Sequence, residues 1–175
     1  PIIPVRANIG SLEDAVAASA SAAEGVGLFR TELLYLSAST QPSRQAQAKS
    51  YAEILSAAPA GPIVVRTIDA GSDKPVPFLD MGHEENPALG VRGYRLIAQH
   101  RDFILDQLAS LELARQESGL EVWVMAPMIA TAVEATEFAK RAREAGEFKV
   151  GVMGETPSLV YESPQLAGQL DFISV

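Results

Sequence analysis

The segment 64–75 gathers charged residues at the end of an apolar run, in an order that suits the binding of an anion. Its charged members are Arg66, Asp69, Asp73 and Lys74. If residues 62–68 form a strand, side chains alternate between its two faces, so that Arg66 shares a face with Val64. A guanidinium at the end of an apolar strand is well placed to bind a phosphate or a carboxylate.

A second arginine ends another apolar segment. Arg30 follows residues 25–29, and Glu32 lies two positions further on. From this segment alone, a structural pair in which Glu32 or a neighbour neutralises Arg30 is as good an interpretation as a phosphate site. Two guanidiniums buried together, however, require anions, which a bound phosphate, Asp69 or Glu32 would supply. The two segments together favour an anion-binding function.

Two more cations are candidates for the same site. Residues 71–74 are typical of a turn, and Lys74 is interpreted either as part of that turn or as a second cation for a phosphoryl group. Residues 84–93 predict a loop that enters a helix over 92–117, with Arg92 in or near its first turn. A cation there lies against the helix dipole, which favours a role facing the site over a structural one.

One carboxylate stands at the end of a later apolar segment. Glu155 follows residues 148–153 and precedes Pro157, which can start a helix. Mg²⁺ prefers one or two protein carboxylates together with substrate oxygens and water, so Glu155 is a candidate metal ligand. On spacing alone, a salt bridge to one of the arginines is the favoured role.

Strands and helices alternate along the chain. Val-rich and Ile-rich segments predict strands at 4–9, 25–29, 62–68, 121–126, 148–153 and 171–175, and the intervening patterns predict helices at 11–23, 42–57, 92–117, 131–145 and 157–168. This order predicts an α/β fold with a parallel sheet and right-handed crossovers. No Gly-x-Gly-x-x-Gly follows the first strand. Polar residues recur at strand ends, as in barrel enzymes of the TIM type, so we predict a barrel.

The composition narrows the function classes. The chain has 175 residues, 47% of them hydrophobic, which is enough for a substantial core. We therefore predict a single domain over residues 1–175. Its net charge of −8 opposes nonspecific nucleic-acid binding. It contains no cysteine, which excludes disulfides and thiolate catalysis and fits a cytoplasmic protein. No apolar run approaches the length of a membrane span, and no signal peptide is recognised.

Four blocks of sequence resemble one family. They are GVGLFRTELL at 25–34, VRTIDAGSDKP at 65–75, EENPALGVR at 84–92 and GVMGETP at 151–157. In this order they resemble the C-terminal phosphoenolpyruvate-binding barrel of enzyme I of the sugar phosphotransferase system, the phosphoenolpyruvate-protein phosphotransferases. The first, third and fourth blocks are shared with other phosphoenolpyruvate and pyruvate barrels. The second block discriminates, because those relatives differ after the arginine.

The resemblance implies a role for each candidate residue. Arg30 and Arg66 match the arginines that hold the phosphate of phosphoenolpyruvate, and Glu155 matches one of two acidic Mg²⁺ ligands. Asp69, Lys74 and Arg92 match supporting site residues. Phosphoryl transfer is mostly positioning and charge stabilisation, which suits arginines and Mg²⁺. The implied partners are phosphoenolpyruvate, a phosphohistidine domain N-terminal to the barrel, a histidine-containing carrier protein and a second copy in a homodimer.

The chain also departs from the family pattern. Residues 171–175 match the sixth strand, whereas the second Mg²⁺ ligand, a further arginine and the proton-donating cysteine of the family lie beyond that point. The acceptor histidine is also absent, because His83 and His100 match no such motif. We therefore expect a truncated barrel without a catalytic residue of its own, inactive alone. Gly154 stands where the family more often has Val or Ile.

Two alternatives remain at this point. The first alternative to an enzyme I barrel is an association module without residual ligand binding, since the family's barrel is also its dimerising part. The second is the domain of another phosphoenolpyruvate or pyruvate enzyme.

The number of strands generates a prediction. A closed barrel of this type needs eight strand–helix units, and only six strands are predicted here. An open sheet exposes strand edges and an apolar interior, so we predict oligomerisation or marginal stability. Sedimentation and calorimetry test this, and a monodisperse monomer that melts cooperatively would contradict it.

Overall fold

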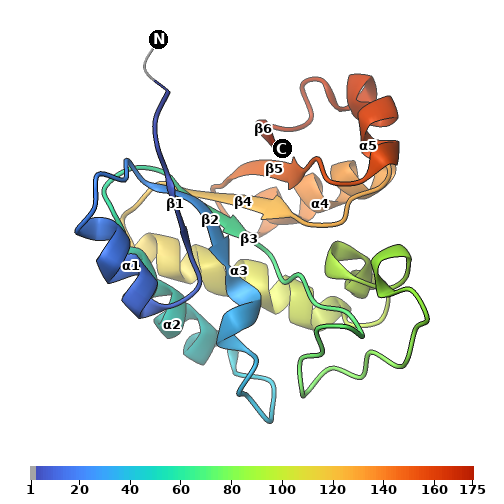
Figure 1. Ribbon diagram of the computed structural model, residues 1–175, viewed down its shortest axis with the longest axis horizontal. Coiled ribbons are helices and arrows are strands. Elements are labelled where there is room, and N and C mark those ends of the chain that lie inside the picture. The colour runs from blue at the N-terminus through green and yellow to red at the C-terminus, as the bar shows by residue number, and fades with distance from the viewer. Residues whose placement is uncertain (1–2) are drawn as a thin grey trace.

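Six parallel strands follow one another across a single curled sheet in the computed structural model, which describes residues 3–175 (Figure 1). Their order in the sheet is their order in the chain. The strands are β1 (Ala7–Ile9), β2 (Val26–Arg30), β3 (Ile63–Arg66), β4 (Val122–Ala126), β5 (Lys149–Met153) and β6 (Phe172–Ser174). This is the strand order of a (β/α) barrel, and the curled sheet forms an incomplete one, which confirms the predicted fold class.

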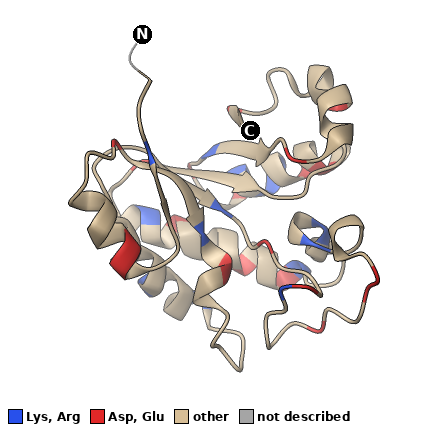
Figure 2. Cartoon of the chain, in the orientation of Figure 1, with Lys and Arg blue, Asp and Glu red and all other residues tan. Residues whose placement is uncertain are grey.

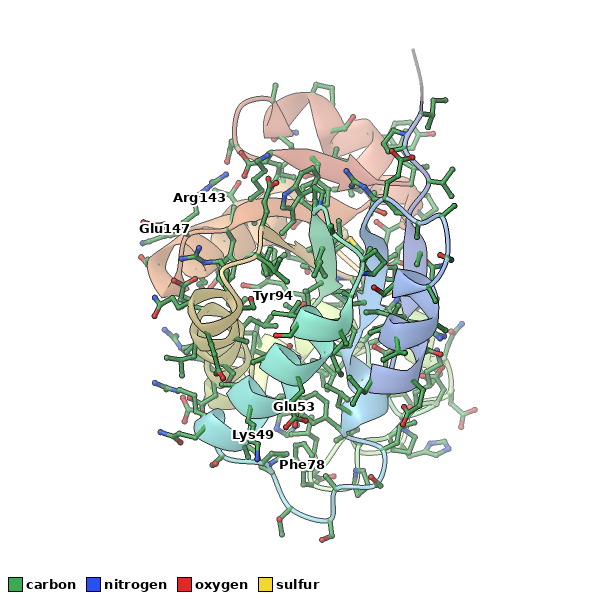
Figure 3. All side chains as sticks on the ribbon, turned by 90° about the vertical axis from the view of Figure 1, so that its left-hand side faces the viewer. Lys49, Glu53, Phe78, Tyr94, Arg143 and Glu147 are labelled. Atoms are coloured by element: carbon green, nitrogen blue, oxygen red, sulfur yellow. The ribbon has the colours of Figure 1, made fainter. Side chains whose placement is uncertain are left out.

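Helices connect successive strands. The α-helices are α1 (Leu12–Ser19), α2 (Arg44–Ala57), α3 (Arg101–Ser118), α4 (Ala132–Ala145) and α5 (Pro157–Glu162), and the 3-10 helices are η1 (Thr31–Leu34), η2 (Pro87–Leu89), η3 (Gly93–Ala98) and η4 (Ser163–Leu166). Right-handed crossovers between neighbouring strands place their helices on one face of a sheet. Figure 3 shows Lys49 and Glu53 on the outward face of α2. Within residues 3–175, no helix has the length and apolar character required to cross a membrane.

Capping residues fix where several helices begin and end. The Ser11 and Ser43 hydroxyls accept the backbone N–H of the third helical residue of α1 and α2. Thr131 and Glu134 form a reciprocal capping box at the start of α4. Helix α3 ends at Gly119, whose φ of 68° is the left-handed conformation that favours glycine. These five residues are of the types that favour helix ends.

The prediction of one continuous helix over 92–117 is wrong for the first third of this range. Arg92 is extended, Gly93 has a φ of 59°, and the chain forms η3 before α3 begins at Arg101. Arg95 donates to the carbonyls of Ala88 and Gly90, which holds η3 against the preceding loop. The apolar spacing is consistent with either helix type, so the pattern does not reveal the break.

The main core lies between the sheet and its helices. Val65, Val124 and Val150 come from adjacent strands, and all three are fully buried. Leu108 of α3 is also fully buried and belongs to the same hydrophobic cluster. Burial of a side chain of this size contributes about 2 kcal/mol to folding. The alternation predicted for 62–68 is confirmed, because Val65 belongs to this core whereas its neighbour Val64 does not.

Aromatic side chains pack on the opposite, inner face of the sheet. The rings of Trp123 and Phe172 lie 5.2 Å apart between centroids. Gly151 lies in register with Phe172 and makes room for it, because a Cβ there would come within 2.6 Å of the Phe172 carbonyl oxygen. The curled interior of the sheet is therefore occupied by side chains at this level.

A buried polar network links α2 and α3 to the ends of two strands. The Gln107 amide of α3 donates to the hydroxyls of Tyr51 and Thr31, at 3.1 Å each, and its carbonyl accepts the backbone N–H of Ile68 at 2.9 Å. The hydroxyls of Tyr35 and Tyr51 hydrogen-bond to each other. Burial raises the pKa of the Tyr51 hydroxyl to about 12, and it also raises the pKa of Tyr35.

This network predicts a loss of stability in alkali. Because the folded pKa of Tyr51 lies above that of the unfolded chain, near 10, its contribution is complete below pH 10 and is lost as the pH rises towards 12. Between pH 8 and pH 11, the free energy of unfolding of Tyr51→Phe should decrease by about 1 kcal/mol less than that of the unsubstituted chain. Urea unfolding followed by circular dichroism measures it. Tyr161→Phe, at a position 84% exposed, is the matched control, and an unchanged pH dependence in Tyr51→Phe would contradict the assignment.

Candidate functional site

Arg66 ends β3 and is buried together with two carboxylates. Its Nη2 lies 2.5 Å from Glu32 Oε1, and its Nη1 lies 3.2 Å from Asp69 Oδ2. All three side chains are less than 10% exposed. Nη1 also lies 3.8 Å from the sulfur of Met153 on β5. The structure therefore shows both of the protein anions that the sequence offered as partners for a buried guanidinium.

Asp69 is shared between two arginines. Arg92 Nε donates to Asp69 Oδ1 at 3.0 Å, while the other carboxylate oxygen faces Arg66. Arg92 Nη1 also donates to Asp73 at 2.9 Å. The hydrogen bond that Arg92 donates to Asp69 raises the pKa of Arg92 against the opposing effect of burial, and the charges of Asp69, Asp73 and Glu155 act in the same direction as that bond. Arg92 therefore lies beside Asp69 and Asp73, and it does so from an extended segment and not from an α-helix.

The two ends of the loop that carries Asp69 and Asp73 contact each other. Gly93 N–H donates to the Ala70 carbonyl at 3.0 Å, so the chain leaves the loop beside the point where it entered. Within the loop, Lys74 N–H donates to the Gly71 carbonyl at 2.9 Å, which confirms the predicted turn. The Lys74 side chain is exposed and has no ion-pair partner within residues 3–175.

Arg30 lies beside Arg66 but differs from it in environment. The two residues are paired in the register of β2 and β3. Arg30 is exposed, and in the described part of the chain it forms no ion pair. Glu32 neutralises Arg66 and not Arg30, so the structural pair considered for Arg30 is not formed. The site thus combines a buried, compensated guanidinium with an exposed, uncompensated one.

Glu155 follows β5 and reaches towards the end of β4. Its Oε1 accepts the backbone N–H of Met128 at 2.7 Å, and Met128 has a φ of 60°, which is uncommon for a residue with a side chain. The favoured prediction of a salt bridge is wrong, since none of the ion pairs within residues 3–175 includes Glu155. The carboxylate is exposed and borders a pocket of about 490 Å³, lined also by Leu89, Arg95 and Ser158.

Charges of both signs meet where β3 leads into its loop (Figure 2). The basic members are Arg30, Arg66, Lys74 and Arg92, and the acidic members are Glu32, Asp69, Asp73 and Glu155. In the described chain no three His, Asp or Glu side chains form a ready-made metal cage. A metal at this edge would have Glu155 as a protein ligand and would need further oxygens from a ligand or from water.

Sequence reasoning missed two contributors to this geometry. The Thr31 hydroxyl donates to the Arg66 carbonyl at 2.8 Å, and Gln107 donates to that hydroxyl from α3. Thr31 adjoins Arg30, so its place near the site was available from the sequence. Gln107 lies 76 positions from Thr31, and no local pattern identifies a helix residue as a partner for a strand end.

The fold and the charged groups at its strand ends together define a class of protein domain. A parallel, barrel-type sheet with charged groups at the carboxyl ends of its strands is the arrangement of barrel domains that bind anionic ligands. Residues 2–175 match the family described as PEP-utilising enzyme, PEP-binding domain. The chain belongs to this family.

Curated relatives carry names that agree with this assignment. The chain is 46% identical over 177 residues to the phosphoenolpyruvate-protein phosphotransferase of Streptomyces coelicolor, covering 99% of the chain and 32% of the relative. It is 40% identical over 180 residues to the multiphosphoryl transfer protein of Rhodobacter capsulatus (99% and 21%), and 39% identical over 188 residues to the phosphoenolpyruvate-protein phosphotransferase of Haloferax volcanii (99% and 33%). The chain thus spans a fifth to a third of the length of these relatives.

The shared carboxylate of Asp69 generates a stability prediction. Asp69→Ala removes the carboxylate that two largely buried guanidiniums share and leaves Arg66 with Glu32 alone and Arg92 with the more exposed Asp73. It should therefore lower the free energy of unfolding by about 3 kcal/mol. Urea unfolding followed by the fluorescence of Trp123, the single tryptophan, measures the change. Asp106→Ala, which breaks an exposed pair with Arg44, is the control and should cost less than about 1 kcal/mol. Equal losses in the two variants would contradict the prediction.

Proposed function

We propose that residues 1–175 form one partial barrel domain that binds phosphoenolpyruvate at the carboxyl ends of its strands. The observation that carries the proposal is the pair of register partners Arg30 and Arg66. Arg66 is held in place by protein carboxylates, while Arg30 beside it is exposed and uncompensated. An anion that meets both is bound by charge-assisted hydrogen bonds. The family membership supports phosphoenolpyruvate as that anion.

Each candidate residue has a role in this proposal. Arg30 and Arg66 bind the phosphate. Asp69 holds Arg66 and Arg92 in relation to each other, as its contacts to both guanidiniums support. Arg92 and Lys74 add positive charge at the rim of the site.

Mg²⁺ is the proposed cofactor, with Glu155 as one protein ligand. The exposed carboxylate at a strand end fits this role, because Mg²⁺ accepts few protein ligands and completes its shell with substrate oxygens and water. When bound, the ion supplies charge neutralisation to the phosphoryl oxygens.

For the whole protein we propose the activity of enzyme I. The phosphorus–oxygen bond of phosphoenolpyruvate breaks, and a phosphorus–nitrogen bond forms to a histidine of an N-terminal domain. The enolpyruvate that leaves takes up a proton at carbon and becomes pyruvate. The phosphoryl group then passes from the histidine to a histidine-containing carrier protein in cytoplasmic sugar uptake. The names of the relatives support phosphoryl transfer. We further propose that the present chain binds without turnover, and release of pyruvate by the purified chain with Mg²⁺ would contradict this part.

Calorimetric titration with phosphoenolpyruvate and Mg²⁺ tests the proposal. The chain should bind weakly, and Arg66→Ala should reduce the affinity at least tenfold, because a buried charge-assisted contact is worth about 1.5–3 kcal/mol. Arg115→Ala, which removes an arginine that pairs with Glu112 on α3, is the control and should leave binding unchanged. Equal affinities in all three proteins would contradict a site at Arg66.

The same samples separate an association module from a binding domain. The exposed edge of the sheet favours the module as second candidate, since Ile173 of β6 is 42% exposed on an end strand. Tight self-association without any binding of phosphoenolpyruvate would support it, with a homodimer as the proposed assembly.

A further inference from the structure

We propose that Glu32 is a positioning residue, which orients the guanidinium of Arg66 for the phosphate. The inference rests on the proposed function, in which Arg66 binds that phosphate. Glu32 and Arg66 are both more than nine-tenths buried, and their closest atoms, Oε1 and Nη2, are 2.5 Å apart. A buried ion pair repays the desolvation of its two charges only if its geometry is held accurately.

The backbone around this pair is fixed by three contacts. Arg30 and Arg66 are register partners, so the ends of β2 and β3 lie side by side. The Thr31 hydroxyl then donates to the Arg66 carbonyl at 2.8 Å. Gln107 holds that hydroxyl and the backbone of Ile68 with one amide group. Glu32 is the next residue after Thr31, within η1, and this framework sets its distance from Arg66.

Some N–H donors of the Arg66 guanidinium have protein partners, and one does not. Nη2 binds Glu32, and Nη1 contacts Asp69 and Met153. Two carboxylates on the two terminal nitrogens fix the plane of a guanidinium. Arg66 Nε and Glu32 Oε2 are buried and have no hydrogen-bond partner within residues 3–175. A buried polar atom without a partner is costly, so this pair retains hydrogen-bonding capacity that a ligand or a water can satisfy.

Loss of the Glu32 charge should therefore change the orientation of the Arg66 guanidinium more than it changes the fold. Without it, Arg66 is held on one side only, by Asp69, which also binds Arg92. The guanidinium then gains freedom about the single bonds of its side chain, and its two Nη groups exchange faster by rotation about the Nε–Cζ bond. A phosphate that binds it must restrict this freedom, and the affinity falls accordingly.

The test compares two buried glutamates in the same chain. Glu32→Gln keeps the size and one acceptor oxygen but removes the charge. Glu112→Gln is the matched control, because Glu112 is also buried and its Oε2 lies 2.7 Å from Arg115 Nε, in α3. Each protein is titrated calorimetrically with phosphoenolpyruvate and Mg²⁺, and the arginine side-chain signals are recorded by ¹⁵N nuclear magnetic resonance without ligand. Arg66→Lys assigns the Arg66 signals by their disappearance.

We expect Glu32→Gln to weaken phosphoenolpyruvate binding at least fivefold and to bring the separate Nη signals of Arg66 into exchange, with far-ultraviolet circular dichroism unchanged. The control should change neither property. Wild-type affinity together with unchanged Arg66 signals in Glu32→Gln would overturn the inference. If the wild-type chain binds no phosphoenolpyruvate, the proposed function fails, and the resonance measurement alone then decides whether Glu32 orients Arg66.

Discussion

A guanidinium inside a sheet must be neutralised, and the structure around β2 and β3 depends on this requirement. Arg66 is buried at a strand end, and Glu32 and Asp69 supply the two opposing charges. Both come from segments that directly follow strands, so the requirement constrains the backbone as well as the side chains. The 3-10 turn after β2 and the first residues after β3 take the paths that bring these carboxylates to Arg66.

The two ends of the curled sheet have different chemistry. At the carboxyl ends of the strands, arginines face carboxylates. Near the opposite end, two cations lie over the Trp123 ring, with the guanidinium carbon of Arg6 at 5.1 Å and the Lys149 nitrogen at 4.7 Å from its centroid. Glu121 accepts from the Trp123 nitrogen and pairs with Lys149, and the Lys149 contact is the main cause of its lowered pKa. Cation–π contacts with one aromatic ring thus distinguish this end from the carboxyl end, where buried ion pairs predominate.

Much of the fold follows from local pattern. Apolar runs separated by helical segments predict a parallel barrel-type sheet, and side-chain caps at Ser11, Ser43 and Thr131 mark where three of the helices begin. The break between η3 and α3 was not predictable in this way, since it depends on Gly93 and on contacts from Arg95 to a loop whose path is not local.

The site was predictable as a set of residues but not as a network. Charged residues at strand ends meet at one edge of a parallel sheet, so the neighbourhood of Arg30 and Arg66 follows from topology. Their ion-pair partners do not follow from topology. Spacing offered Glu32 as one possible partner of Arg30 and favoured an ion pair for Glu155, whereas in the structure Glu32 pairs with Arg66 and the Glu155 carboxylate accepts a backbone N–H. Which acid meets which base depends on side-chain reach and burial, which a linear pattern does not contain.

The loop that leaves β3 returns to its own starting point, where Gly93 bonds to Ala70 and Arg92 pairs with Asp69. The residues between these two contacts form a loop whose two ends are joined by this hydrogen bond and ion pair. Val76, Leu79 and Met81 of the loop pack in the core, whereas residues 82–86 are its more exposed part. Because the cost of closing a loop grows only slowly with the number of residues, insertions and deletions in this exposed part leave the two ends in place. Evolution can therefore remodel what this loop presents to the surroundings of the site while Arg66 and Arg92 stay where they are.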